Sequence, residues 1–310
     1  MTTAPDSLLS RSRLRERLLA AGFLAPSFLL FAVFVFYPLT RTAWLGLHQQ
    51  DAFGGNEVYV GFRQYTDVLK SNELHHSLWI TLQFVLIIVP AGLVLGTALA
   101  VLAHKPLKAV GVFRTIFSST IATSVAVASL MWLVLLNPSI GVLANALPIH
   151  VLKNPGLLNS PSWALLAVSA SSVWENLGFT FVVITAGLQS IPEELQESAL
   201  VDGAGSWRRF VGVTLPLLSP TLLLASVVLT IGALQTFGQI DLLTKGGPAL
   251  HTNVIVYSIF GDASPISGND GVQAATSIVL FLVILVLSLV QVRFLDRRVH
   301  YEVLGDGGRR

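Results

Sequence analysis

The 310-residue chain has no cysteine, and only 12% of its residues carry charge. The missing cysteine excludes disulfides, thiolate nucleophiles and cysteine-ligated metals, and leaves the redox compartment unreadable. Soluble domains carry about 25% charged residues, so roughly half of the usual solvating charge is missing. Hydrophobic residues make up 53% of the chain, and the mean hydropathy is +0.70. These values indicate an integral membrane protein.

Motifs that would supply chemistry are also missing. No lysine follows a glycine, so the chain lacks the G-x-x-x-x-G-K-[S/T] loop that cradles nucleotide phosphates. The seven histidines show no H-E-x-x-H spacing, and His75, His76 and His104 fall at the edges of apolar stretches, where they read as surface residues. No nucleophile–base or metal set of an intramembrane enzyme can be assembled. We expect a non-catalytic chain without a cofactor or metal of its own and without a nucleic-acid partner.

Six apolar stretches are each long enough to cross a bilayer, which takes about twenty residues. They cover residues 18–40, 78–103, 113–136, 163–188, 215–238 and 274–294. Arginines from Arg11 to Arg17 precede the first stretch, but its length favours an uncleaved span over a signal peptide, whose apolar core has about 7–15 residues. The third stretch is rich in Thr and Ser, which favours a position inside a bundle, and Trp132 near its end is typical of an interface anchor. We predict an all-α membrane protein with six transmembrane helices in a single domain, 1–310.

The basic residues predict how these spans are oriented. With the N-terminus inside, 14 Lys and Arg residues fall on that side and 5 on the other. Since Lys and Arg accumulate in cytoplasmic segments, both termini are predicted to be cytoplasmic. The outside segment 48–77 contains "YVGFRQYTDVLKSNEL", which predicts a short amphipathic helix at the surface. The outside segments 137–162 and 239–273 are rich in Gly, Pro, Asn and Ser, and are predicted to be turns and loops.

A polar segment, residues 191–220, separates the fourth and fifth apolar stretches on the predicted cytoplasmic side. Ser190 with Glu193 three residues later predicts a capping box at a helix start. Gly203 predicts the end of that helix, because glycine accepts the left-handed conformation. A second helical piece follows. The segment therefore predicts two short exposed helices over about 191–212, although geometry alone leaves open that they merely cap the bundle.

The same segment carries a spaced motif, formed by Glu197, Ser198, Ala199, Asp202, Gly203, Ala204, Val213, Leu215 and Pro216. It resembles the cytoplasmic signature of the inner-membrane permeases of binding-protein-dependent ABC importers, Glu-Ala-Ala, then Asp-Gly-Ala, then an aliphatic residue, any residue and Leu-Pro. The one departure is Ser198 in place of the first alanine, a small residue for a small one. Three further segments resemble the maltose and glycerol-phosphate type of this family: "APSFLLFAVFVFYPLTRTAWLGL", "VGFRQYTDVL" and "TFGQIDLLTKGGPALHTN".

The resemblance implies several partners. The motif marks a coupling helix that inserts into a cleft of an ATPase subunit, and ATP and magnesium belong to that ATPase dimer. A heterodimer with a second six-span permease, an extracytoplasmic solute-binding protein and a bacterial inner membrane are implied as well.

The solute implied is glycerol 3-phosphate or a glycerophosphodiester, because the chain as a whole is most similar to the first permease subunit of glycerol-phosphate importers. A sugar or oligosaccharide is the alternative within the family. A channel or ion-coupled secondary carrier is the alternative of another class. Such a carrier tends to show several midplane charges and paired, broken helices, and one central Glu without a visible repeat counts against it.

One ionisable residue lies near the middle of the fourth apolar stretch. Ionisable groups at bilayer depth are rare and usually functional, which makes Glu175 a candidate for the substrate path. Its neighbours Trp174 and Asn176 are candidates to stack on, or hydrogen-bond to, a polyhydroxyl solute. The alternative is that Glu175 pairs with a neighbouring helix or meets water at a shallower depth.

The end of the fifth apolar stretch supplies a second set of path candidates. Gln235 and Gln239 are four residues apart and are predicted to share a helix face. Thr236 and Phe237 lie beside that face, and Asp241 follows two residues after Gln239. The alternative role for these side chains is hydrogen bonding between helices.

Overall fold

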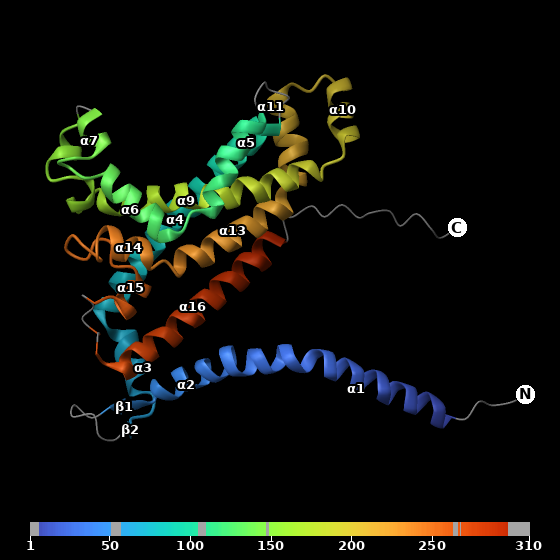
Figure 1. The fold of residues 1–310 in the computed structure, drawn as a ribbon, viewed down its shortest axis with the longest axis vertical. Helices are drawn as coiled ribbons and strands as arrows, with labels where there is room; N and C mark the ends of the chain where they lie inside the picture. The colour runs from blue at the N-terminus through green and yellow to red at the C-terminus, as the bar shows by residue number, and fades with distance from the viewer. Residues whose placement is uncertain are drawn as a thin grey trace, which may run out of the picture. The chain divides into compact units, whose positions relative to one another are not determined.

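The computed structural model describes residues 6–50, 57–104, 110–146, 149–262, 266 and 268–296, and most of their regular structure is helical (Figure 1). Contacts between residues divide the chain into two compact units. Unit 1 comprises Met1–Val68 and Asn269–Ile278, and unit 2 comprises Leu69–Gly268 and Val279–Arg310. The single domain expected from the sequence stays a prediction.

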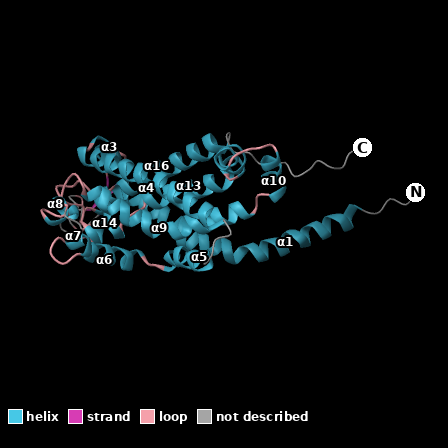
Figure 2. Ribbon diagram, turned by 90° about the horizontal axis from the view of Figure 1, so that it is seen from above, coloured by secondary structure: helices cyan, strands magenta, loops and turns pink. Residues whose placement is uncertain are grey.

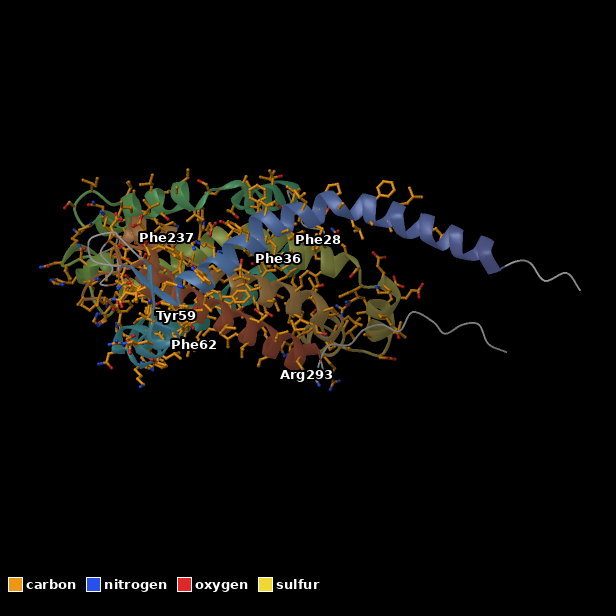
Figure 3. The ribbon with its side chains drawn as sticks, turned by 90° about the horizontal axis from the view of Figure 1, so that it is seen from below. Phe28, Phe36, Tyr59, Phe62, Phe237 and Arg293 are labelled. Carbon is orange, nitrogen blue, oxygen red and sulfur yellow. The ribbon has the colours of Figure 1, made fainter. Side chains whose placement is uncertain are left out.

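Unit 1 begins with a long apolar helix. It consists of α1 (Asp6–Phe31), the π-helical turn η1 (Ala32–Phe36) and α2 (Tyr37–Leu45). The wide turn ends two residues before Pro38, whose ring and missing N–H disturb regular α-helical bonding. The segment Leu19–Leu45 is long and apolar enough to cross a membrane, and its large side chains are exposed, as Figure 3 shows for Phe28.

A β-hairpin follows the helix in unit 1. β1 (His48–Gln50) pairs antiparallel with β2 (Glu57–Tyr59), and His48 lies opposite Tyr59. The ring of Trp44 stacks on His48 with 4.2 Å between ring centroids. The hairpin was not anticipated from the sequence, because strands of three residues are too short to show an alternating pattern.

Helix α3 (Arg63–Lys70) confirms the amphipathic helix predicted for this segment. It buries Gln64 and Val68, which lie four residues apart on one face. The Gln64 side-chain amide donates a hydrogen bond to the backbone oxygen of His48 at 2.9 Å and so joins helix and hairpin. Burial raises the pKa of Tyr65, whose hydroxyl donates to the backbone oxygen of Ala43 at 3.2 Å.

Unit 2 is a bundle built around two long helices, α4 (Asn72–His104) and α9 (Ala164–Gln189). Against them pack α5 (Val110–Ser119), η2 (Thr120–Ala122), α6 (Val125–Leu135) and α13 (Ser219–Leu234). Residues from 279 onward of α16 (Asp270–Asp296) also belong to unit 2. In this part of α16, the Gln291 amide donates to the hydroxyl of Ser226 on α13 at 3.0 Å.

Glycines set how closely these helices approach. A side chain at Gly96 of α4 would collide with Thr180 of α9, and one at Gly187 of α9 would collide with Thr221 of α13. At Gly92 of α4 the added carbon would lie 3.2 Å from Leu229 of α13. Small residues at helix interfaces allow this approach, which is how helices associate when no hydrophobic difference from lipid drives them together.

Four helices are long and apolar enough to cross a membrane, and the number rises to six if each of two bent pairs counts as one span. The four are Leu19–Leu45, Asn72–His104, Ala164–Gln189 and Asp270–Arg293, which match the first, second, fourth and sixth predicted stretches. The third predicted span, 113–136, is not one straight helix: the chain bends by 107° at Thr123 and Ser124, where the Ser124 hydroxyl caps α6.

The fifth predicted span, 215–238, is also interrupted. The π-helical turn η4 (Phe210–Thr214) and the short α12 (Leu215–Leu217) precede α13, and the bend between the pieces is 67°. The segments expected to be only turns and loops hold short helices: α7 (Val142–Ala146), α8 (His150–Lys153), η3 (Leu157–Asn159), α14 (Gly238–Leu243) and α15 (Ile255–Phe260).

Candidate functional site

The helix of the fifth stretch stops in the middle of its polar candidates. α13 ends at Leu234, residues 235–237 are not helical, and α14 starts at Gly238. The prediction that Gln235 and Gln239 share a helix face is therefore wrong: Gln235 is exposed, whereas Gln239 is 5% exposed. The break lets α14 pack against α6, with a side chain at Gly238 leaving only 2.9 Å to Val125.

Glu175 of α9 meets Gln239 of α14. The Gln239 side-chain amide donates to Oε2 of Glu175 at 3.1 Å, and the Asn176 amide donates to the same oxygen at 3.0 Å. Asn176 also donates to the backbone oxygen of Ser172 at 2.8 Å. Candidates from the fourth and fifth stretches, 64 residues apart in sequence, thus form one partly buried polar cluster.

The other predicted path residues surround this cluster more loosely. Trp174, Thr236, Phe237 and Asp241 are all partly buried. The Thr236 hydroxyl donates back to the oxygen of Gly232 at 3.0 Å. Phe237, labelled in Figure 3, stacks on Tyr257 with ring centroids 5.7 Å apart. Of the set, only Glu175, Asn176 and Gln239 are joined to one another by hydrogen bonds within the described chain.

Buried donors that the sequence did not single out lie on α9 and α6. The hydroxyls of Ser171 and Ser172 on α9, and of Ser129 on α6, are buried without a hydrogen-bond partner among the described residues. Ser171 and Ser172 precede Glu175 by four and three residues, so they flank its face of the helix. This spacing is the signal that could have found them.

Trp132 belongs to this group as well, which corrects its prediction as an interface anchor. It packs against a core cluster that contains Val168 and Val173 of α9 and Ile240 and Leu243 of α14, and its indole N–H is buried without a partner in the described part of the chain. A buried donor without a partner costs about 1–3 kcal/mol. With the hydroxyls of Ser129, Ser171 and Ser172, the Trp132 N–H makes four buried donors without a partner among the described residues, on α6 and the first half of α9.

The segment after α14 is a tightly pinned turn. The Thr252 hydroxyl donates to the backbone oxygen of Gly247 at 2.6 Å and lies 2.8 Å from the Thr244 hydroxyl. The hydroxyl of Thr81 on α4 accepts from the backbone N–H of Ile255 at 2.9 Å, at the start of α15. These bonds fix α14 and α15 to the bundle although their segment was expected to be loop.

A second region lies at the other end of unit 2. Figure 1 shows α10 (Glu193–Val201) and α11 (Ser206–Arg209) at the end opposite to α14 and α15, and Figure 2 agrees for α10 and α14. The predicted capping box is wrong: Pro192 holds the N-cap position, and the Ser190 hydroxyl donates to Gly187 at 2.8 Å and ends α9 instead. Glu193 and Glu194 lie in the first turn of α10, where the helix dipole favours negative charge.

The predicted end of this helix is confirmed. Gly203 has a φ of +76°, a conformation that side-chain-bearing residues rarely adopt. The N–H groups of Gly203 and Ala204 donate to the oxygens of Leu200 and Ala199, each at 3.0 Å, and so satisfy the last carbonyls of the helix. Space does not require glycine here, since nothing lies within 4 Å of an added carbon. The backbone angle does.

The surface of this region is apolar where a solvent-facing loop would be polar. Val201 is 87% exposed, Trp207 76% and Leu200 58%. Around them, Glu197 and Ser198 of the motif are exposed, and Ala199, Ala204, Leu215 and Pro216 are partly buried. Apolar side chains held out at the end of a short, capped helix are typical of a docking surface for another protein.

A bundle of membrane-length helices with a polar, discontinuous helix at one end and a docking surface at the other defines a transport protein of the membrane. The chain belongs to the family described as "Binding-protein-dependent transport system inner membrane component", which it matches over residues 88–301. It is thus a multi-pass permease subunit of an ABC importer in the inner membrane, and it is not an enzyme.

Relatives and a solved structure agree with this class. The sn-glycerol-3-phosphate transport system permease protein UgpA of Agrobacterium fabrum is 33% identical over 291 residues, which are 92% of this chain and 97% of the relative. The trehalose/maltose transport system permease protein MalF of Thermococcus litoralis is 32% identical, covering 93% and 97%.

A crystal structure of a bacterial alginate ABC transporter in complex with an alginate pentasaccharide-bound periplasmic protein shares the fold, with a TM-score of 0.79 and 23% identity over 92% of this chain and 96% of that one. Membership of the family excludes the ion-coupled carrier that the sequence left as an alternative. The ATPase of such importers is a separate protein, so the chain needs no cofactor of its own.

Proposed function

We propose that the chain forms half of the translocation path of an importer for glycerol 3-phosphate or a glycerophosphodiester. The observation that carries the path is the hydrogen bond between Glu175 and Gln239, beside the non-helical residues 235–237. Irregular backbone at membrane depth is tolerated where it lines a cavity rather than lipid. The unpartnered donors Ser129, Trp132, Ser171 and Ser172, on the helices α6 and α9 that pack against α14, support a hydrated path for solute beside α14.

The docking surface on α10 supports a partner ATPase dimer on the opposite side. Its apolar residues are exposed, and the cap at Gly203 fixes the end of α10. The docking surface is therefore a well-defined helix end rather than an irregular loop. An ATPase that closes on ATP would carry α10 with it and shift the bundle from inward-open to outward-open. A loaded solute-binding protein would favour the outward state, because it binds the two states unequally.

The orientation proposed is cytoplasmic for α10 and for both termini. The 14-to-5 split of basic residues supports it. In unit 2, Arg208 and Arg209 lie on α11, the next helix after α10, and Arg114 lies on α5, toward the same end of the unit in Figure 1, whereas Lys153 lies on α8 at the other end (Figure 2). The partner across the path is a second six-span permease, completing a heterodimer.

For the solute, the 33% identity to glycerol-phosphate permeases over nearly the whole chain supports a phosphate ester. A neutral sugar is the second candidate, and one observation favours it. The polar cluster presents a carboxyl and two amides without Lys or Arg, although a phosphate is bound best by basic residues or helix N-termini. In the phosphate-ester proposal, the solute-binding protein supplies most of the charge selectivity.

The test is ATP hydrolysis by the complete importer in proteoliposomes, with the loaded solute-binding protein on one side. Glycerol 3-phosphate, glycerophosphocholine, trehalose and maltose are offered in turn, and uptake is measured with each. Stimulation by the phosphate esters alone supports the proposal. Stimulation by the disaccharides alone overturns it in favour of the sugar candidate.

A further inference from the structure

One side-chain hydrogen bond ties the docking helix to the rest of unit 2. The side-chain amide of Gln196, the fourth residue of α10, donates a hydrogen bond to the hydroxyl of Thr214, the last residue of η4. The two atoms are 3.0 Å apart. Within the described part of the chain, no other side-chain hydrogen bond joins α10 to another element. Thr214 is 8% exposed, so water competes poorly for this bond.

Thr214 also takes part in the entry to the fifth span. Its backbone oxygen accepts from the N–H of Leu218 at 2.9 Å, at the bend between α12 and α13. Leu218 is fully buried in a cluster with Phe181, Ile184 and Leu188 of α9. A continuous chain of contacts therefore runs from α10 through Gln196 and Thr214 into the core of the bundle.

The backbone between α10 and the fifth span is less able to transmit a displacement. Beyond the hydrogen-bonded cap at Gly203, the C-terminal end of α10 leads into Gly205, around which nothing lies within 4 Å, and a second open glycine, Gly212, lies inside η4. Glycine has the greatest backbone freedom, so rotations there would absorb a movement of α10. The side-chain bond bypasses Gly205 and Gly212, because Thr214 lies beyond them in the sequence.

We propose that Gln196 and Thr214 are positioning residues that transmit movement of α10 to the fifth span. The inference rests on the proposed function, in which α10 docks on an ATPase. Neither residue has to touch the ATPase or the solute. Without their bond, α10 still docks and ATP is still hydrolysed, but the movement is lost at the glycines and less solute is imported for each ATP.

The experiment measures solute imported per ATP hydrolysed in proteoliposomes that hold the complete importer. Gln196→Met keeps the length of the side chain and removes the donor, and Thr214→Val keeps its shape and removes the acceptor. Each change is expected to lower the ratio by about three- to tenfold, the size expected for one net side-chain hydrogen bond. The double variant is expected to be no worse than either single one, because both remove the same interaction.

Two variants serve as controls. Thr214→Ser keeps the hydroxyl and should restore the ratio, which a loss of packing at this site would not explain. Gln189→Met makes the same chemical change at the exposed end of α9 and should leave the ratio unchanged. An unchanged ratio in Gln196→Met, or additive losses in the double variant, overturns the inference.

A second measurement covers the case in which Thr214→Val does not fold. The chain has no cysteine, so Gln196→Cys and Thr214→Cys can be bridged by a short bifunctional thiol reagent without background reaction. Bridging should preserve import, whereas a loss of import on bridging would mean that the two residues must separate and would overturn the link.

The inference and the proposed function fail in different ways. If the unchanged chain retains no ATPase on purification and shows no solute-stimulated ATP hydrolysis, the docking role of α10 is wrong. If the unchanged chain couples normally and the Gln196 and Thr214 variants couple equally well, only the link is wrong.

Discussion

The two ends of unit 2 differ in which side chains they expose and which they bury. At the docking end, apolar residues such as Val201 and Trp207 are exposed, and so are polar residues of the motif such as Glu197. At the end with α14, polar groups such as Gln239 and Ser171 are buried. An exposed apolar patch outside the spans marks a surface that a protein partner covers, and a buried donor costs about 1–3 kcal/mol until something hydrogen-bonds to it. The difference separates recognition of a partner from recognition of a solute.

The largest effect is expected at the docking end from Gly203→Val. A β-branched residue at φ +76° costs roughly 1–2 kcal/mol or more, so the end of α10 will refold and its apolar residues will no longer be presented together. Uptake should fall by more than about tenfold, and the ATPase should be lost on co-purification. Gly203→Asn is the control, since asparagine tolerates the left-handed conformation. Equal retention of the ATPase by both variants would contradict this account.

At the polar end, Gln239→Leu removes the side-chain amide of α14 that donates a hydrogen bond to Glu175 of α9. Losing a hydrogen bond to a partly buried carboxyl is expected to cost about 1–3 kcal/mol and to lower uptake by roughly tenfold. The ATPase should still co-purify, because α10 is untouched. Gln235→Leu makes the same change at an exposed position across the helix break, and transport assays of the two variants should differ clearly. Similar losses of uptake in the two variants would show that transport does not depend on the hydrogen bond to Glu175.

Val201→Ser tests whether an exposed apolar side chain of the docking surface contributes to ATPase binding. The side chain is 87% exposed, so its truncation should leave the melting temperature of the isolated chain unchanged within error. Loss of an apolar contact at an interface should weaken ATPase binding by about fivefold, or about 1 kcal/mol. A binding titration with the purified ATPase measures this. A lower melting temperature with intact binding would place Val201 in the fold rather than in the interface.

The smallest effect is expected from Ser190→Ala. Its hydroxyl closes the end of α9 in an exposed position and does not cap α10, so its loss should cost less than about 0.5 kcal/mol. Thermal unfolding of the variant measures the cost. A loss near 1 kcal/mol, the value typical of an N-cap, would revive the capping box that the sequence suggested.

Sequence reasoning located the long spans and the docking motif because hydropathy and spacing report them directly. It also found Glu175, since a single acid in an apolar helix stands out. It did not predict which polar side chains are brought together or buried, for two physical reasons. Gln235 and Thr236 are both compatible with a helix, so nothing in the pattern marks the break that separates Gln235 from Gln239. Serines such as Ser171 fit any helix, and only burial shows that their hydroxyls have no partner.

The wide turn η4 has a consequence for changes in chain length. A π-helical turn holds one residue more than an α-helical turn, so deleting one residue within Phe210–Thr214 would convert it to a regular helix and leave the directions of its neighbours nearly unchanged. The same deletion inside α9 would rotate everything beyond it by about 100° and turn Glu175 away from Gln239. Evolution can therefore adjust the length of the chain between the docking helix and the fifth span without rebuilding the path.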